Sequence, residues 1–473
     1  MRKQHLLMLL VGMSTCLFSS LSAQTALTLE QARQSALEHN LQIRADQEKL
    51  AAARDLKKAA FTYFMPSLSA MGDFTYMNKK IKYEQDLGLD KILAGMAQAN
   101  PSVQTDPFYQ TLAGLMQQGL LPDKLTLELG QHKNYLAGLS LNQPLFTGGK
   151  IYNQYKLAGL NANLNKISSE LSKYEVLENT DEAYWRLVSL LEKVRLAGQY
   201  KTMVEAHVAD VQNLLDAGMA TTNDFLKAKV TLNEAELQLL KAQDGLALST
   251  MALNRIMGQQ LSTELIPADT SIVTTVSFDS MPSLQDVLAK RQEIAALKTG
   301  MQMNKALERL AISGYLPNVL LSAGYGVMRP NPYNSLEDEF GDDWQVSIVA
   351  EWNIFHWNER GYTLAAAKHN THAVEYKLQD VQEAIELEVT QAWFLYQESI
   401  KKIKLTESSL AQATENLRLT TDKFNDSMAS STDVIDAQVS WQKAYSENID
   451  ARADFRAQTT RLQKACGNLD REE

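Results

Sequence analysis

The sequence holds very little cysteine, with two residues in 473. Cys16 lies within an apolar N-terminal run, which leaves Cys466 alone in the rest of the chain. A single thiol forms neither an intramolecular disulfide framework nor a cysteine-based metal cluster. We therefore expect a fold held together by packing, with Cys466 as a small buried residue near the C-terminus.

Long apolar runs and catalytic motifs are also missing. Beyond the N-terminal run no stretch of 18 apolar residues occurs, so no transmembrane helix is expected. The sequence has no phosphate-binding glycine loop, no nucleophile elbow and no HExxH motif. His369 and His372 are three residues apart, but no carboxylate–histidine motif completes a metal site around them. We expect neither an enzyme nor a bound metal or cofactor.

The N-terminus and the net charge indicate where the protein works. A basic start is followed by an apolar run from Leu6 to Leu21 and by small residues up to Ala23. This order is typical of a secretory signal peptide, which we place at residues 1–23. An N-terminal anchor helix and lipidation at Cys16 remain alternatives. The formal net charge of −10 argues against nucleic acid as a partner.

One unit occurs twice in the chain. A constant shift of 209 positions superimposes the two copies without a gap over more than a hundred residues. A period this long indicates a duplicated module rather than a short solenoid repeat. We assign a first repeat to residues 24–266, a polar linker to 267–282 and a second repeat to 283–473. The matched pairs include Phe146 with Phe355, Ala183 with Ala392, Met219 with Met428, Asp224 with Asp433, Ala228 with Ala437 and Gly258 with Gly467.

Each module is expected to begin with one helix. In the first module Thr28 is the expected N-cap, and in the second Ser283 stands in capping-box spacing with Asp286. Pro66 and Pro317 close these helices, because proline cannot continue a helix. Two strands, one very long helix and a returning helix follow in each module.

Four segments alternate between apolar and polar residues. Each is about ten residues long, the length that a tilted strand needs to cross a bilayer. An ordinary amphipathic hairpin in a soluble sandwich is the alternative. The first strand pair carries a long insertion at residues 79–133, with helical spacing at Leu89 to Ala99 and Tyr109 to Leu120. The expected strands are Leu68 to Tyr76, Tyr135 to Phe146, Val319 to Val327 and Trp344 to Ile354.

The helices after the strands are too long for a compact domain. No proline occurs from Gly149 to Leu215, a stretch that as a helix would measure on the order of 100 Å. Heptad spacing in the second module supports an elongated bundle or coiled coil. Its heptad positions are Ile403, Leu410, Leu417 and Phe424, with Thr406, Ala413 and Thr420 between them.

Each long helix ends at a compact break, at residues 216–224 and 425–433. Gly218 is an expected left-handed cap, and the following Ser and Thr residues are expected N-caps of the returning helices. The simplest interpretation of Asp224 and Asp433 is that they cap these helices and compensate the helix dipole. Asp436 follows Asp433 by one turn on the same face of the helix.

These features resemble the TolC-like outer-membrane efflux protein family (outer membrane factor), over nearly the whole chain after the signal. Residues 432–437 resemble the constriction of that family, and residues 144–149 resemble its passage from strand to helix. The tip signature of the family, Gly-x-x-Thr/Ser-x-x-Asp-x-x-x-Ala, is matched by Gly218, Thr221, Asp224 and Ala228, and in part by Ser430, Asp433 and Ala437.

The resemblance implies a mainly α protein with β, a duplicated strand-helix protomer with four transmembrane β-strands and very long coiled-coil helices. Three copies would form a 12-stranded β-barrel continued by a periplasmic α-helical barrel in the outer membrane of a Gram-negative bacterium. The implied function is the passive exit duct of a tripartite efflux or type I secretion system. Its implied partners are a periplasmic adaptor (membrane fusion protein), an inner-membrane pump and outer membrane lipid.

The resemblance also implies site residues. Asp433 and Asp436 would form the pore constriction, where like charges raise some pKa values and attract cations. Ser427 departs from the glycine common in the family, and Phe424 replaces an aromatic hydroxyl. An exported coiled-coil scaffold without a pore is the alternative function. The expected residues of the tips and the adaptor contact are Gly218, Thr221, Asp224, Ser427 and Ser430.

Overall fold

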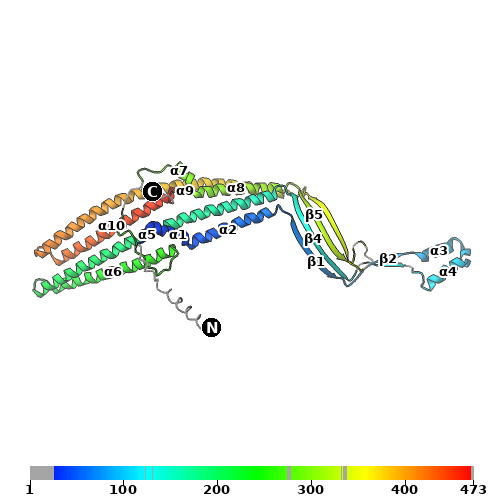
Figure 1. The fold of residues 1–473 in the computed structure, drawn as a ribbon, viewed down its shortest axis with the longest axis horizontal. Helices are drawn as coiled ribbons and strands as arrows, with labels where there is room; N and C mark the ends of the chain where they lie inside the picture. Colours follow the sequence, from blue (N-terminus) through cyan, green and yellow to red (C-terminus); the bar gives the residue numbers. More distant parts are fainter. Residues whose placement is uncertain are drawn as a thin grey trace, which may run out of the picture. The chain divides into compact units, whose positions relative to one another are not determined.

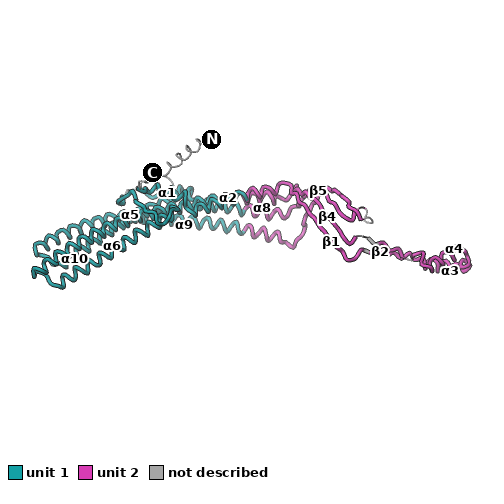
Figure 2. The backbone as a smooth tube through the Cα atoms, turned by 60° about the horizontal axis from the view of Figure 1, so that its bottom comes forward, with its two compact units in different colours: residues 1–55, 159–304, 369–473 teal, residues 56–158, 305–368 magenta. Residues whose placement is uncertain are grey.

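The computed structural model describes residues 26–122, 124–129, 131–273, 278–331, 333 and 338–469. The signal peptide expected at residues 1–23, with Cys16, lies outside this part of the chain. Two compact units are present, coloured separately in Figure 2. Unit 1 comprises residues 1–55, 159–304 and 369–473, and unit 2 comprises residues 56–158 and 305–368.

Unit 2 contains an antiparallel sheet of four strands in the order β1-β4-β5-β6 (Figure 1). β1 and β4 come from the first repeat, whereas β5 and β6 come from the second, and the β4–β5 pair joins them. The two repeats therefore share one sheet, whose edge strands are β1 and β6. The bounds are β1 Ser67–Tyr76, β4 Lys133–Phe146, β5 Asn318–Arg329 and β6 Gly341–Glu351.

All four expected strands are present, and the largest differences in their bounds are at β6, which begins at Gly341 rather than at Trp344. β6 ends at Glu351 rather than at Ile354. Glu351 pairs with Asn318, the first residue of β5, so the residues after Glu351 have no partner strand. The chain then passes into the next helix through Trp357 and Asn358, which both have positive φ.

The insertion between β1 and β4 has its own secondary structure. Its first helix, α3, spans Leu89–Ala99, as the spacing of apolar residues predicted. The second, α4, spans Pro107–Gln117 and begins two residues before the predicted start, because Asp106 caps it and proline fits its first turn. The sequence did not indicate the two-stranded ribbon of β2 Ile81–Asp86 and β3 Lys124–Leu129, nor the 3-10 turn η1 Pro101–Thr105.

Unit 1 contains most of two antiparallel helical hairpins, α5 with α6 and α9 with α10 (Figures 1 and 2). The two long helices, α5 Lys150–Asp216 and α9 Glu359–Asn425, have 67 residues each. The returning helices, α6 Thr222–Ile256 and α10 Ser431–Ala465, have 35 each. None of the helices in the described ranges combines the length and the apolar character needed to cross a bilayer.

The predicted heptad seam of α9 is confirmed by burial. All seven predicted positions from Ile403 to Phe424 are buried or half-buried, and the residues between them are exposed except Thr421. A strip of buried residues at this spacing is what a helix packed lengthwise on a neighbour requires.

The single first helix expected in each module is wrong, because each is two helices. In the first module these are α1 Leu29–His39 and α2 Leu41–Thr62, and in the second α7 Leu284–Lys290 and α8 Gln292–Ser313. Thr28 does cap α1, in a capping box with Gln31. The capping box expected at Ser283 is absent, since its side chain makes no cap hydrogen bond.

The breaks fall at Asn40 and Arg291, which have almost the same extended backbone, φ −62° and ψ 128° against φ −67° and ψ 124°. The side chain of Asn40 donates a hydrogen bond of 3.0 Å to the carbonyl of Ile256, the last residue of α6. Arg291 donates one of 3.0 Å to the carbonyl of Ala465, the last residue of α10. Since Ile256 and Ala465 are 209 positions apart, the same device occurs in both modules.

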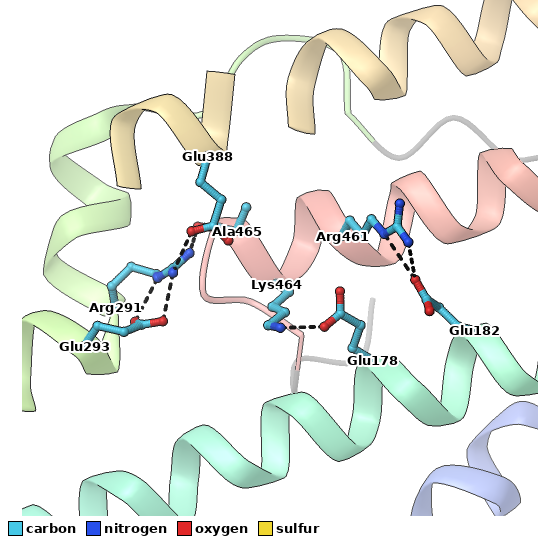
Figure 3. A network of polar contacts seen from close by, with 8 residues as sticks. All are labelled: Glu178, Glu182, Arg291, Glu293, Glu388, Arg461, Lys464 and Ala465. Atoms are coloured by element: carbon cyan, nitrogen blue, oxygen red, sulfur yellow. Dashed lines mark hydrogen bonds and ion pairs between the residues drawn. The ribbon is translucent and has the colours of Figure 1, made fainter. Parts of the chain in front are cut away.

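Ion pairs around the second break join α10 to the rest of unit 1 (Figure 3). The buried guanidinium of Arg291 also binds Glu293 and Glu388. Two basic residues of α10 pair with acidic residues of α5, as Figure 3 shows: Arg461 with Glu182, and Lys464 with Glu178. The seam between α5 and α10 is therefore held by side chains as well as by packing.

Candidate functional site

The first hairpin tip is a tight glycine turn. Gly218 follows the end of α5 with φ +74°, the left-handed conformation expected from the sequence. Its N–H donates to the carbonyl of Leu215 at 2.9 Å, and that of Met219 donates to Leu214 at 2.8 Å. These bonds satisfy carbonyls at the C-terminus of α5 that have no helical partner.

The second tip has the same backbone with a serine in place of glycine. Ser427 has φ +61°, and its N–H donates to Phe424 at 2.9 Å. The N–H of Met428 donates to the carbonyl of Lys423 at 2.7 Å. A left-handed conformation costs a residue with a Cβ about 1–2 kcal/mol. The second tip is thus the more strained of two equivalent turns.

Capping boxes begin both returning helices. Thr221 Oγ1 donates to Asp224 Oδ2 at 2.6 Å, and the N–H of Asp224 donates back to Thr221 at 3.2 Å. Ser430 and Asp433 repeat this arrangement at 2.7 and 3.2 Å. The hydroxyl and N–H of each cap residue hold the pKa of its partner carboxyl below the usual range. Both aspartates therefore complete capping boxes, in which Thr221 and Ser430 are the N-cap residues.

Asp433 and Asp436 lie on the outer face of α10. Neither carboxylate is buried, whereas Val434 and Ala437 between and beside them are. Because they are three positions apart, the two carboxylates stand about one turn apart on the same side of the helix. This arrangement leaves both carboxylates able to face another molecule.

Two tip residues were overlooked as site candidates. Met219 and Met428 are exposed large apolar side chains at equivalent positions of the two turns. Their match under the 209-residue shift was the available signal. Exposed methionines suit adaptable contacts, since the thioether side chain is flexible and polarisable.

His207 was also overlooked. It lies on α5 near the tip, is 4% exposed and contacts both helices of the second hairpin. Sequence gave no signal for it, because its partners are more than two hundred residues away.

The family described as "Outer membrane efflux protein" matches residues 32–259 and 283–468. The chain belongs to the outer membrane efflux protein family. Its two matched segments cover most of the chain and leave a gap between residues 259 and 283.

Relatives and solved structures agree with the family. The alkaline protease secretion protein AprF of Pseudomonas aeruginosa is 24% identical over 345 residues, covering 72% of this chain and 71% of AprF. The outer membrane protein TolC of Vibrio cholerae is 21% identical over 296 residues, covering 61% and 66%. The CmeC outer membrane channel of Campylobacter jejuni has the same fold, with a TM-score of 0.74, 15% identity and coverage of 93% and 86%.

The resemblance noted from the sequence is confirmed. As a member of the outer membrane efflux protein family, the protein is an outer-membrane exit duct of an efflux or secretion system and extends into the periplasm. The family is one of channel proteins rather than enzymes. Membership of this family of channel proteins rules out the alternative function, an exported coiled-coil scaffold without a pore.

Proposed function

We propose that three copies of this chain close into one hollow conduit, through which substrate passes passively to the exterior. The copies contribute four strands each to a 12-stranded β-barrel, and their hairpins form an α-helical barrel in the periplasm. The observation that carries this proposal is a difference in exposure between matched positions of the two repeats.

Within one chain, α5 of the first hairpin packs along α10 of the second. Lys193 Nζ lies 2.6 Å from Asp450 Oδ1 across this seam, and Thr460 Oγ1 donates to Asp181 at 3.0 Å. Trp185, on α5, is 6% exposed and lies under the guanidinium of Arg456 of α10.

The matched positions in the other repeat have no such burial. Trp185 corresponds to Phe394, which is 67% exposed, and Leu196 at 3% corresponds to Leu405 at 69%. On the returning helices, Ile449 at 1% corresponds to Leu240 at 55%. The hairpins are equivalent, so positions that differ in this way face the seam between hairpins. We infer that α9 of one copy packs on α6 of the next, a head-to-tail contact that closes into a ring.

The sheet supports the same closure. Its edge strands β1 and β6 each have a neighbour on one side only within the described residues. Apolar strands with open edges are unstable in lipid, whereas pairing β6 of one copy with β1 of the next satisfies every edge. Trp344, Val346 and Ile348 alternate along β6 and are all exposed, which suits contact with outer membrane lipid.

The hairpin tips supply the constriction and the docking surface. Asp433 and Asp436 from three copies gather six carboxylates at the periplasmic end, a ring that prefers cations and binds divalent ions. The periplasmic adaptor, joined to an inner-membrane pump, contacts the tips with Met219 and Met428 at their centres. The other adaptor-contact residues are Gly218, Thr221, Asp224, Ser427 and Ser430.

The assembly is tested with a matched pair of substitutions on α9. Phe394→Glu places a charge on the inferred contact face and is expected to break the trimer. Leu419→Glu is the control, because Leu419 is exposed and its counterpart in the first repeat, Asp210, is an exposed carboxylate already. Native mass in detergent reports the oligomer. A trimer that survives Phe394→Glu as well as it survives Leu419→Glu would contradict the proposed contact.

A further inference from the structure

One side chain of the first hairpin holds both helices of the second. His207 Nε2 lies 2.9 Å from Ser431 Oγ at the start of α10, and its ring centroid is 5.1 Å from that of Phe424 on α9. Its neighbours Glu205, Ala206 and the two residues after Val208 are exposed, whereas His207 itself is buried. Ser431, which makes this contact, lies two positions before Asp433 at the tip of the second hairpin.

The surroundings of the ring contain little charge. Burial lowers the pKa of His207 below its ordinary value, while Asp210 on the same helix raises it more weakly. From α9 the ring meets an aromatic side chain. From α10 it meets Ser431, whose hydrogen bond also raises the pKa of His207, but less than burial lowers it. The charged residues next to Ser431 and Phe424 in the sequence either bind another residue or are exposed to solvent. The Asp433 carboxylate binds Ser430, and Lys423 is exposed.

We propose that His207 is a proton-sensitive latch, which holds the second hairpin and its two aspartates against the first hairpin while the imidazole is neutral and releases them when it is protonated. The effect on the constriction rests on the proposed function, whereas the movement of the tips does not. His207 is thereby a positioning residue for Asp433 and Asp436.

The direction of the pH effect follows from the surroundings. Because the folded pKa lies below 6.5, the latch is complete at neutral pH and is lost as the pH falls through the folded value. A buried imidazolium needs water or a carboxylate, so protonation favours the state in which the two hairpins part. Each unit between the folded and the ordinary pKa corresponds to about a tenfold change in the latch equilibrium.

The internal repeat restricts this response to one seam. The positions matched to His207 and Ser431 are Asn416 and Thr222, which in the proposed trimer meet across the contact between copies. Neither an amide nor a hydroxyl side chain takes up a proton near the pKa of a histidine. Acidification from neutral pH through the folded pKa of His207 should therefore loosen the seam within each chain and leave the one between chains in place.

The test measures the distance between the tips, with spin labels at Met219→Cys and Met428→Cys in the full chain. Cys466 stays unmodified, since burial raises the pKa of its thiol to about 11. On stepwise acidification from neutral pH to below the folded pKa of His207, the distance distribution is expected to broaden to longer values. His207→Gln keeps a hydrogen-bonding group but takes up no proton, so it should remove the response. His369→Gln, at an exposed histidine, should keep it.

Single-channel conductance over the same pH range distinguishes the two proposals. Conductance that rises on acidification in the natural chain and stays constant in His207→Gln supports both. Tips that respond in a protein without currents would overturn the proposed function and leave the latch standing. Currents with tips that do not respond, or a response that His207→Gln retains, would overturn the latch.

Discussion

The two corners where α6 and α10 end allow a sharp prediction, because they share a backbone but differ in their neighbours. Gly258 and Gly467 both follow the returning helix, with φ +68° and +69°. A Cβ on Gly258 would stand 2.6 Å from the carbonyl oxygen of His39, a backbone atom. A Cβ on Gly467 would meet its nearest atom, Cβ of Lys290, at 3.3 Å.

Alanine should therefore cost more at the first corner than at the second. The left-handed conformation costs both variants about 1–2 kcal/mol. Gly258→Ala must also move the α1–α2 break, an overpacking cost of about 1–3 kcal/mol. Gly467→Ala needs a shift of only a few tenths of an ångström from Cβ of Lys290.

Thermal melting followed by helical circular dichroism, in one detergent and at one protein concentration, compares the variants. Gly467→Ala is expected to melt slightly below the natural chain, and Gly258→Ala clearly below both. Equal losses, or a larger loss for Gly467→Ala, would refute the argument that the packing of His39 on the glycine sets the difference.

Three further predictions concern other residues of unit 1. Ser430→Ala removes the hydroxyl that lowers the pKa of Asp433, so this pKa should move up toward 3.8, as NMR titration of the carboxyl would show. In the natural chain this cap should be complete at neutral pH and weaken below about pH 4. A carboxyl whose pKa is lowered by folding stabilises the fold only while it is charged. Asp181→Asn leaves the guanidinium of Arg33, which binds Asp181 at 2.6 and 2.7 Å, without its buried partner. This change should cost about 3 kcal/mol in melting experiments. Ser427→Gly relieves the left-handed serine and should raise the melting temperature, and a lowered one would count against strain at this tip.

Local patterns in the sequence predicted much of the fold. The heptad residues of α9, the tip turn at Gly218 and the strand β6 depend on residues within a few positions of one another. The structure contains each of these features. The duplication allowed more features to be predicted, because a feature recognised in one repeat indicates its counterpart in the other.

Features that depend on distant partners were missed. The helix breaks at Asn40 and Arg291 contain neither proline nor glycine, and they exist because each side chain binds the last carbonyl of a returning helix. The contact of His207 with Ser431 spans 224 positions. Capping at Ser283 was predicted from spacing alone, and spacing does not show that the side chain reaches the backbone N–H.

The most direct test of the proposed conduit is the single-channel conductance of the detergent-purified protein in a planar bilayer, with and without its constriction aspartates. The natural chain is expected to be a trimer with small, cation-preferring currents that divalent ions block. Replacing Asp433 and Asp436 together by alanine should raise the conductance and weaken the block. Unchanged currents and block would leave both residues without a role in the constriction, and a monomer without currents would contradict the conduit itself.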